Sequence, residues 1–310
     1  MILKKSEMKL SIVIATYNRS ERLIRCLESV AGQSSKSSSW ECVVVNNNSS
    51  DDTELKFKAF VEKYPHLDFK MVFCAKQGLS EARNCGIDSS VGDYIAFIDD
   101  DETLCDGYIA SVLDFFGRDA AFAAGGPVIA KYEHKRPSWL TKFPEKMIAN
   151  PIQLPSGTKT FPRNMIPAGG NMIFNREVFT IYGKFNTSLG RNGEQLLGGE
   201  ETEMFSRIRN LGERLYYIPK AAIYHHISKD KLTLEYFDKL SYGVGVSKIL
   251  RCESRAQQQR VLSEERTKNR KAYLLALAYL LTGSVKKMKM MLRMRSQILR
   301  GAEDAKNGKV

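Results

Sequence analysis

Short apolar runs alternate with amphipathic segments over the N-terminal third of this chain. The runs that predict strands are rich in β-branched or aromatic residues and cover residues 10–15, 42–45, 69–74 and 94–98. Between them, apolar residues recur at helical spacing, as in the segment from Ser20, a candidate N-cap, to Gly32. Strands that alternate with helices predict an α/β fold with a mostly parallel central sheet, flanked by helices.

The pattern is less regular in the second half of the chain. Residues 121–129, 172–174 and 214–218 predict further strands, and a helix is expected from Glu200 to Gly212. Residues 131–168 contain six prolines and predict a long irregular excursion. Beyond Lys231 the sequence becomes strongly charged and then helical. We therefore predict a domain of residues 1–230 followed by a basic helical C-terminal extension of residues 231–310.

Four consecutive acidic residues, Asp99 to Glu102, follow the buried strand at 94–98. Carboxylates clustered at the carboxyl end of a strand predict a hard divalent cation such as Mg²⁺ or Mn²⁺, because these ions take oxygen ligands. The alternative is a solvated acidic turn. Loops that follow parallel strands lie along one edge of the sheet, so Thr16, Asn47, Arg83 and Asp99 are expected to converge in a nucleotide-sized cleft.

Two other parts of the chain carry candidate chemistry. Glu201 has the spacing of the inward face of its predicted helix and Glu200 lies at the edge of that face, so Glu201 is either a general base or a carboxylate that satisfies the helix N-terminus. The adjacent His225 and His226 are either an ordinary core or surface pair or ligands of a cation that carboxylates already hold.

Composition limits the possible partners. The net charge of +12 attracts anions in general, but no helix-turn-helix, zinc or RNA-binding pattern occurs, so we expect no nucleic acid partner. Six cysteines without CxxC spacing predict reduced core thiols, with no disulfide and no zinc site. Residues 1–9 are too polar for a signal peptide and no apolar run is long enough to span a bilayer, which predicts a cytoplasmic protein.

The tail combines a ten-residue apolar run, Ala272 to Leu281, with a lysine- and arginine-rich segment at 286–300. Such a basic helical tail with an apolar stripe can lie on an anionic membrane, at the inner face of the cytoplasmic membrane. The alternative is that the run packs onto the main domain, because Tyr273, Leu277 and Leu280 also have the spacing of a core-facing helix.

Six segments in order and spacing resemble the family-two inverting glycosyltransferases: residues 11–19, 43–53, 78–84, 97–101, 170–171 and 199–201. The resemblance covers about residues 8–228. It implies the GT-A-like, Rossmann-like nucleotide-sugar-binding fold of that family. It also implies a nucleotide-sugar donor such as a UDP-sugar, with Mn²⁺ or Mg²⁺.

Carried over by position, the resemblance assigns roles to individual residues. The donor side comprises Thr16, Tyr17, Asn18, Asn47, Arg83, Asp99 and Asp100. Asp99 and Asp101 match the family's DXD motif, and His225 or His226 lies where some members complete the metal shell. Glu201, with Glu200 beside it, matches the general base. The acceptor is expected between residues 131–171, including Trp139, Gly170 and Asn171, and the helix that begins at Glu200.

Two departures from the family pattern affect these assignments. Asn46 and Asn47 stand where the loop usually carries one or two aspartates, and Glu201 stands where an aspartate is usual. The resulting hypothesis is a metal-dependent inverting glycosyltransferase that uses a glycan or lipid-linked acceptor in surface polysaccharide or glycolipid synthesis. The alternative is a non-catalytic nucleotide-sugar or glycan-binding protein of the same fold.

Overall fold

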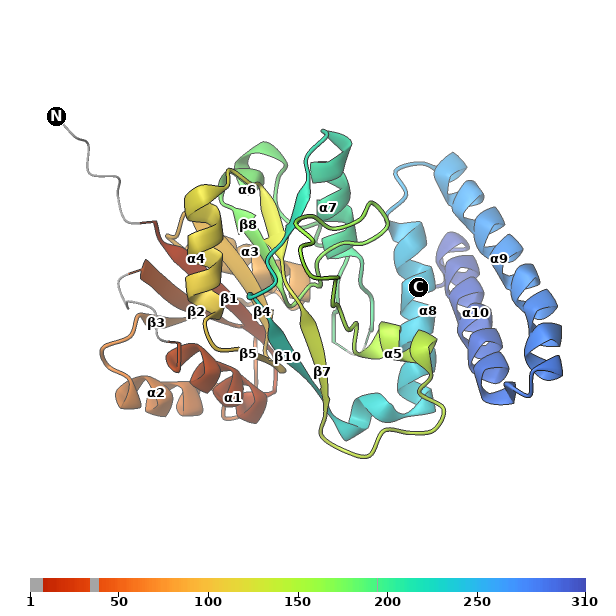
Figure 1. The fold of residues 1–310 in the computed structure, drawn as a ribbon, viewed down its shortest axis with the longest axis horizontal. Helices are drawn as coiled ribbons and strands as arrows, with labels where there is room; N and C mark the ends of the chain where they lie inside the picture. Colours follow the sequence, from red (N-terminus) through yellow and green to blue (C-terminus); the bar gives the residue numbers. More distant parts are fainter. Residues whose placement is uncertain (1–7, 34–38, 194) are drawn as a thin grey trace. The chain divides into compact units, whose positions relative to one another are not determined.

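A twisted central sheet organises the N-terminal part of the protein (Figure 1). The computed structural model describes residues 8–33, 39–193 and 195–310, and within these residues seven strands form the sheet in the order β3-β2-β1-β4-β8-β6-β9. The strands are β1 (Leu10–Thr16), β2 (Trp40–Asn46), β3 (Phe69–Phe73), β4 (Tyr94–Asp99), β6 (Ala123–Gly125), β8 (Met172–Asn175) and β9 (Leu215–Tyr217). The first four are parallel, whereas β8 is antiparallel to both β4 and β6. The predicted mostly parallel α/β fold is confirmed.

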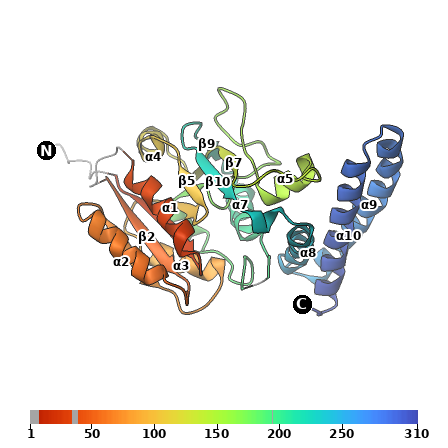
Figure 2. The same cartoon turned by 90° about the horizontal axis from the view of Figure 1, so that it is seen from below.

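Three helices connect the parallel strands: α1 (Ser20–Ala31), α2 (Thr53–Lys63) and α3 (Leu79–Ser89). Helices α1 and α2 lie side by side (Figures 1 and 2). Because the connection from β3 returns across the sheet to β4, a right-handed crossover places α3 on the opposite face. Gly86 lets α3 approach β1 closely, since a Cβ at this position would lie 2.3 Å from Val13 Cγ1. The strands between these layers are almost entirely buried.

A second, three-stranded sheet has the order β5-β10-β7, with β5 (Glu102–Leu104), β7 (Val128–Tyr132) and β10 (Ile223–Ile227). Strand β10 pairs antiparallel with β5 and places His225 opposite Glu102. The remaining helices are α4 (Tyr108–Arg118), α5 (Lys142–Ile148), α6 (Glu177–Ile181), α7 (Glu200–Asn210), the short 3₁₀ helix η2 (Lys229–Leu232), α8 (Leu234–Leu250), α9 (Arg255–Leu281) and α10 (Val285–Lys306).

The chain forms two compact units. Unit 1 comprises residues 1–130, 152–186 and 201–226, and unit 2 comprises residues 131–151, 187–200 and 227–310. Unit 2 thus contains two segments from the middle of the chain that a single boundary at residue 230 does not anticipate. Inside unit 2, α8 and α10 meet backbone to backbone, because a Cβ on Gly245 would lie 2.0 Å from the Ile298 carbonyl oxygen. None of the helices among the described residues is long and apolar enough to cross a membrane.

Several local predictions are wrong. Ser20 is not the N-cap of α1 but its first residue, because Arg19 holds the N-cap position and no side chain caps the helix there. Residues 121–129 are not one strand but parts of β6 and β7, and the irregular excursion contains α5. Glu102 belongs to a strand rather than to a polar turn.

The six cysteines are free thiols, and Cys74 and Cys85 have sulfur atoms only 2.6 Å apart.

A buried carboxylate joins three elements at the amino end of the parallel sheet. Glu41 on β2 is 1% exposed and accepts hydrogen bonds from Ser11 Oγ and the Val91 amide, each at 2.6 Å. Lys70 Nζ on β3 lies 2.8 Å from its other oxygen. Burial alone would raise the pKa of Glu41, but the bonds from Lys70 and Ser11 outweigh burial and hold it below its usual value.

We predict that Glu41→Gln lowers the free energy of unfolding by about 2 kcal/mol at pH 7, because Lys70 and the Ser11 hydroxyl then lose a charged acceptor. A lowered carboxyl pKa contributes stability above the pKa of the unfolded chain, and this is lost as pH falls through that value toward the folded pKa. Urea unfolding between pH 3.5 and 7 should therefore show a smaller pH dependence for the variant. Exposed Glu62→Gln is the control, and equal effects of the two substitutions would contradict this account.

Candidate functional site

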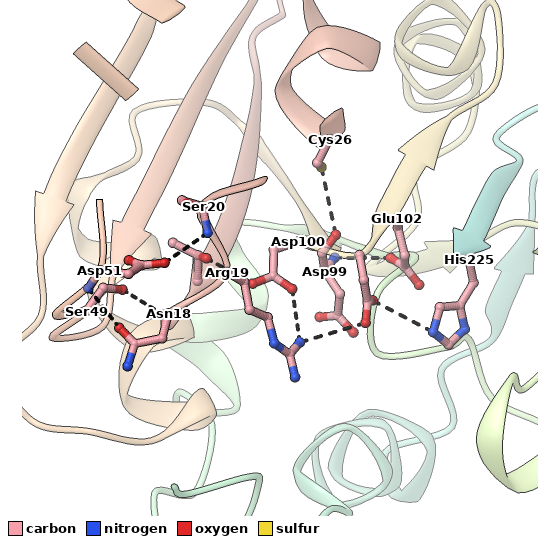
Figure 3. Close-up of polar contacts among 12 residues, drawn as sticks. Asn18, Arg19, Ser20, Cys26, Ser49, Asp51, Asp99, Asp100, Glu102 and His225 are labelled. Carbon is pink, nitrogen blue, oxygen red and sulfur yellow. Dashed lines mark hydrogen bonds and ion pairs between the residues drawn. The ribbon is translucent and has the colours of Figure 1, made fainter. Parts of the chain in front are cut away.

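The candidate site of unit 1 is built around the four acidic residues that end β4 and begin β5 (Figure 3). Asp100, Asp101 and Glu102 are each less than 5% exposed, whereas the side chain of Asp99 is 39% exposed. Three adjacent carboxyl groups at such low exposure are not a solvated turn. Each one is held by a defined set of partners.

Asp100 is bound by the last residue of β1 and by a residue of the loop that follows. Thr16 Oγ1 donates to Asp100 Oδ2 at 2.9 Å, and Arg19 Nη1 donates to Asp100 Oδ1 at 3.1 Å. Burial raises the pKa of Asp100 to about 6 and the adjacent Asp101 adds to the rise, while Arg19 and Thr16 oppose it. The predicted donor-binding residues Thr16 and Asp100 therefore serve to anchor the β1–α1 loop to the end of β4.

Asp99 is bound from the other side of the sheet. Arg83 on α3, whose side chain is 3% exposed, donates through Nη2 to Asp99 Oδ1 and to the Gly169 carbonyl, both at 3.1 Å. Of the residues predicted to converge, Thr16, Asn47, Arg83 and Asp99, Arg83 contacts Asp99 directly. The Asn47 backbone N–H donates to the Thr16 carbonyl at 2.9 Å. Because Arg83 is buried and paired, it fixes the carboxylate of Asp99, which keeps the more exposed position.

Asp101 faces a histidine. His225 Nε2 lies 3.7 Å from Asp101 Oδ1, which is too long for a hydrogen bond. Two ligand bonds of about 2.1 Å each span up to about 4 Å, so a cation fits between these two atoms. The described residues contain no group of three or more acidic, histidine or cysteine side chains that could hold a metal. Two protein ligands suit an ion that also binds a diphosphate, since Mg²⁺ keeps one or two carboxylates and takes substrate phosphates as further ligands.

His226 has a different environment. Its Nε2 lies 2.9 Å from Thr103 Oγ1, and its backbone amide donates to the Asp101 carbonyl at 2.9 Å. The side chain is 7% exposed. Of the two predicted histidines, His225 is thus the one that lies beside Asp101, and His226 is the core histidine of the pair.

Glu102 binds the backbone of the acidic cluster. Its Oε2 accepts the Asp99 amide at 3.0 Å, and a Cβ on Gly170 would lie 2.0 Å from this oxygen. Gly170 was predicted to contact the acceptor. The structure gives it a packing role, because only a residue without a side chain fits against the Glu102 carboxylate.

The loops after β1 and β2 are tied to each other. Asn18 has a φ of 51°, and its side-chain Oδ1 accepts a hydrogen bond from the Ser50 backbone N–H at 2.7 Å. The backbone N–H of Asn18 donates to Ser49 Oγ at 3.0 Å. Asn47 donates to the carbonyls of Cys74 and Lys76 and accepts the Gly78 amide at 2.8 Å. Asn18 and Asn47 therefore shape the loops. Among the predicted donor residues in these loops, Tyr17 and Asn18 are exposed, Tyr17 at 41%.

The acceptor-binding prediction for Asn171 is wrong. Asn171 is 0% exposed, accepts from the Tyr108 hydroxyl at 2.9 Å and donates to the carbonyls of Pro127 and Ala221. These bonds tie β8 to neighbouring segments, and a side chain without exposed surface cannot reach a ligand. Trp139 belongs to unit 2, where its ring packs 5.9 Å from that of Phe237.

The orientation predicted for the acidic pair at the start of α7 is also wrong. Glu200 is the buried member, at 4% exposure, and Glu201 is only half-buried. A half-exposed carboxylate can meet a substrate more readily than a buried one. The residue chosen as the candidate base is therefore compatible with the structure, although the inward-face reason for choosing it is not.

Sequence reasoning missed Arg19 as part of the site, and it grouped Glu102 with the acidic cluster without predicting that Glu102 is buried. Arg19 Nη1 lies 3.1 Å from Asp100 and 3.7 Å from Asp101, and its side chain is 35% exposed, so it places positive charge beside the acidic cluster. Its position in the loop after β1, next to three predicted donor residues, was the available signal. The burial of Glu102 had no local signal, because it depends on β5 pairing with the distant β10.

Comparison with known proteins gives consistent matches. The model of a family described as Glycosyl transferase family 2 matches residues 11–182. The chain is 27% identical over 277 residues to the succinoglycan biosynthesis protein ExoM of Rhizobium meliloti, covering 87% of this chain and 81% of that protein. It is also 27% identical over 254 residues to a glucosyl-dolichyl phosphate glucuronosyltransferase of Haloferax volcanii, covering 78% of this chain and 76% of that one.

Solved structures share the fold at low identity. The mannosyltransferase PcManGT from Pyrobaculum calidifontis, solved with GDP-Man and Mn²⁺, aligns with a TM-score of 0.64 and 16% identity over 97% of this chain and 88% of that chain. Residues 1–349 of S. aureus TarS, solved with UDP-GlcNAc, align with a TM-score of 0.55 and 17% identity over 98% of this chain and 84% of that chain. Both alignments extend beyond unit 1.

We predict that Gly170→Ala destabilises the protein by about 3 kcal/mol, because the new methyl group would overlap the buried Glu102 carboxylate. Thermal unfolding measures the change. Gly117→Ala on α4 is the matched control, because its Cβ would meet only Met8 at 3.7 Å. Equal melting temperatures for the two variants would contradict the packing role assigned to Gly170.

Proposed function

Because the chain belongs to glycosyltransferase family 2, we propose that its acidic cluster holds the diphosphate of a nucleotide-sugar donor through a divalent cation, Mn²⁺ or Mg²⁺. The protein is a glycosyltransferase that moves a sugar from a nucleotide-diphosphate donor to an acceptor hydroxyl, with relatives in polysaccharide and glycolipid synthesis. The cation, the donor base and the acceptor are the proposed parts. No relative named above supports a non-catalytic binding protein.

The observation that carries the proposal is the pairing of Asp101 with His225 at 3.7 Å, next to the partly exposed Asp99. Asp101 and His225 would hold the cation, and Asp99, fixed by Arg83, would bind the ribose or the diphosphate. When bound, the cation offsets the negative charge of the departing diphosphate. Arg19 adds a second positive charge at the same place.

We propose Glu201 as the general base. In an inverting transfer, the acceptor oxygen attacks the anomeric carbon from the face opposite the leaving diphosphate, and the base takes the hydroxyl proton. Glu201 is half-buried at the start of α7, and helix N-termini in general favour negatively charged side chains. Glu200, which is buried, would then position this end of the helix.

A UDP-sugar is the proposed donor, and the proposed acceptor is a glycan or a lipid-linked glycan at the inner face of the cytoplasmic membrane. Two relatives support a lipid-linked acceptor by their names: the dolichyl phosphate enzyme and a GalNAc(5)-diNAcBac-PP-undecaprenol beta-1,3-glucosyltransferase of Campylobacter jejuni, 26% identical over 227 residues. Competition between UDP and GDP for the enzyme with Mn²⁺ tests the donor base.

We predict that Asp101→Asn removes Mn²⁺-dependent binding of UDP while the fold is retained, because the amide keeps the shape of the side chain but loses the charge that attracts the cation. Isothermal titration calorimetry with UDP, with and without Mn²⁺, measures this. Asp106→Asn, an exposed aspartate just after β5, is the control. If Asp101→Asn binds UDP and Mn²⁺ as the unmodified protein does, the cation site lies elsewhere.

We predict that Glu201→Gln lowers turnover by about 10²-fold or more with donor affinity nearly unchanged, which is the expected result of losing a general base. Glu200→Gln should have a smaller effect on turnover. Steady-state kinetics and UDP binding on the same preparations separate turnover from donor binding. The reverse order of the two effects on turnover would assign the base to Glu200.

A further inference from the structure

We propose that one end of unit 2 is a docking surface for an anionic phospholipid membrane. This end contains the α9–α10 turn and the start of α8. We call it the hairpin end, and it consists of Trp139, Leu234, the C-terminal part of α9 from Arg270 and residues 285–293 of α10. The inference deepens the proposed function, on which it rests for the identity of a membrane-bound acceptor. All of its residues belong to unit 2.

The first observation is an unusually wide apolar face on α9. Tyr273, Leu274, Leu275, Leu277, Leu280 and Leu281 are between 51% and 90% exposed, and in this stretch only Ala272 and Ala276 are buried. The exposure of Tyr273, Leu277 and Leu280 disagrees with the alternative in which these three side chains face a core. At 100° per residue the exposed apolar side chains cover about 220° of the helix circumference.

The width of this apolar face indicates whether a partner helix or a lipid layer covers it. A partner helix in a second copy of the chain covers a stripe of about 100° or less, so it would leave half of these side chains in water. Acyl chains have no fixed shape and can surround the whole arc. The face therefore fits a lipid layer better than it fits a coiled-coil partner.

The second observation is a pocket of about 480 Å³ at the same end of the unit, lined by Trp139, Leu234, Lys286, Lys289, Met290, Leu292 and Arg293. It combines apolar walls with three cationic side chains and has no acidic lining residue. Arg293 is paired with Asp238 at 2.5 Å, whereas Lys286 and Lys289 have no ion pair with any residue in the part of the chain that the structure describes. Such a pocket suits an anionic group carried on an apolar support.

The charges around the hairpin end have one sign. From Arg266 to Ala302 the sequence contains ten lysines and arginines and no acidic residue. Arg270 and Lys271 are exposed one turn before the leucines, and Lys286, Lys287 and Lys289 are exposed just after the turn. Long cationic side chains can reach phosphate groups while their stems stay along the apolar surface. Leucines for the acyl region and lysines for the headgroups together provide two membrane signals, which hold a protein better than either alone.

The fluorescence of Trp139 reports vesicle binding at the hairpin end directly, because the chain has only two tryptophans and the other, Trp40, is 1% exposed. Vesicles of brominated phosphatidylglycerol should quench the tryptophan fluorescence of the full chain, and this quenching should disappear in Trp139→Phe. Vesicles of brominated phosphatidylcholine should quench much less. Absence of quenching by the anionic vesicles at low salt would overturn the proposal.

Co-sedimentation with the same anionic vesicles tests the two signals separately. Lys286→Glu with Lys289→Glu should lower the vesicle partition coefficient at least about tenfold, because two attractive charges become repulsive. Leu277→Ser with Leu281→Ser should lower it by a similar factor and leave binding that salt abolishes. Lys58→Glu with Lys220→Glu, the same charge change on exposed residues of unit 1, is the control and should bind nearly as the unmodified chain does.

Three outcomes would contradict the proposal: equal losses for the hairpin-end and control variants, no loss with Leu277→Ser and Leu281→Ser, or a stable dimer in sedimentation equilibrium that the leucine substitutions dissociate. Melting temperatures exclude unfolding as the cause of lost binding. Calorimetry with UDP and Mn²⁺ on the same variants separates the two proposals. Vesicle binding without UDP binding would contradict the proposed function but not the docking surface. UDP binding without vesicle binding would contradict only the docking surface.

Discussion

The structure of the site depends on burying the carboxyl groups of Asp100, Asp101 and Glu102 next to one another. Such a cluster is costly unless each group has partners, because adjacent carboxylates repel and lose water. Thr16 at the end of β1 and Arg19 in the loop after it supply partners for Asp100, and the Asp99 amide supplies one for Glu102. The raised pKa of Asp100 reflects the remaining cost, in which burial is the largest contribution. A cation beside Asp101 and His225 would relieve this repulsion, which links the stability of the loop to ligand binding.

The same constraint explains why several expected ligand contacts are structural. Holding the cluster requires rigid loops, and Asn18, Asn47 and Asn171 all use their amide groups to bind backbone atoms of neighbouring segments. Gly170 is small because Glu102 lies against it. The residues that keep exposed surface for a donor include Tyr17, Asn18, Asp99 and part of Arg19. A family motif thus contains residues that form the site as well as residues that bind in it.

The parallel half of the sheet could be predicted from sequence because each strand is an apolar run that is followed by a helix, as at Leu10–Thr16. Convergence of Thr16, Arg83 and Asp99 followed from parallel topology alone. The burial of Glu102 could not be predicted, since it depends on pairing with a strand more than 100 residues away. The exposure of Leu277 and Leu280 could not be predicted either, because the same spacing serves a core helix and a lipid-facing one. Local patterns specify elements, whereas burial depends on what each element meets.

The central claim is that a divalent cation bound between Asp101 and His225 holds the donor diphosphate. A crystal structure of the protein with UDP and Mn²⁺, with manganese located by anomalous scattering, tests it most directly. The account predicts one manganese peak within about 2.3 Å of both Asp101 Oδ1 and His225 Nε2, with the remaining ligands from the diphosphate and water. A manganese ion bound away from Asp101, or UDP bound in the cleft without any metal, would contradict it.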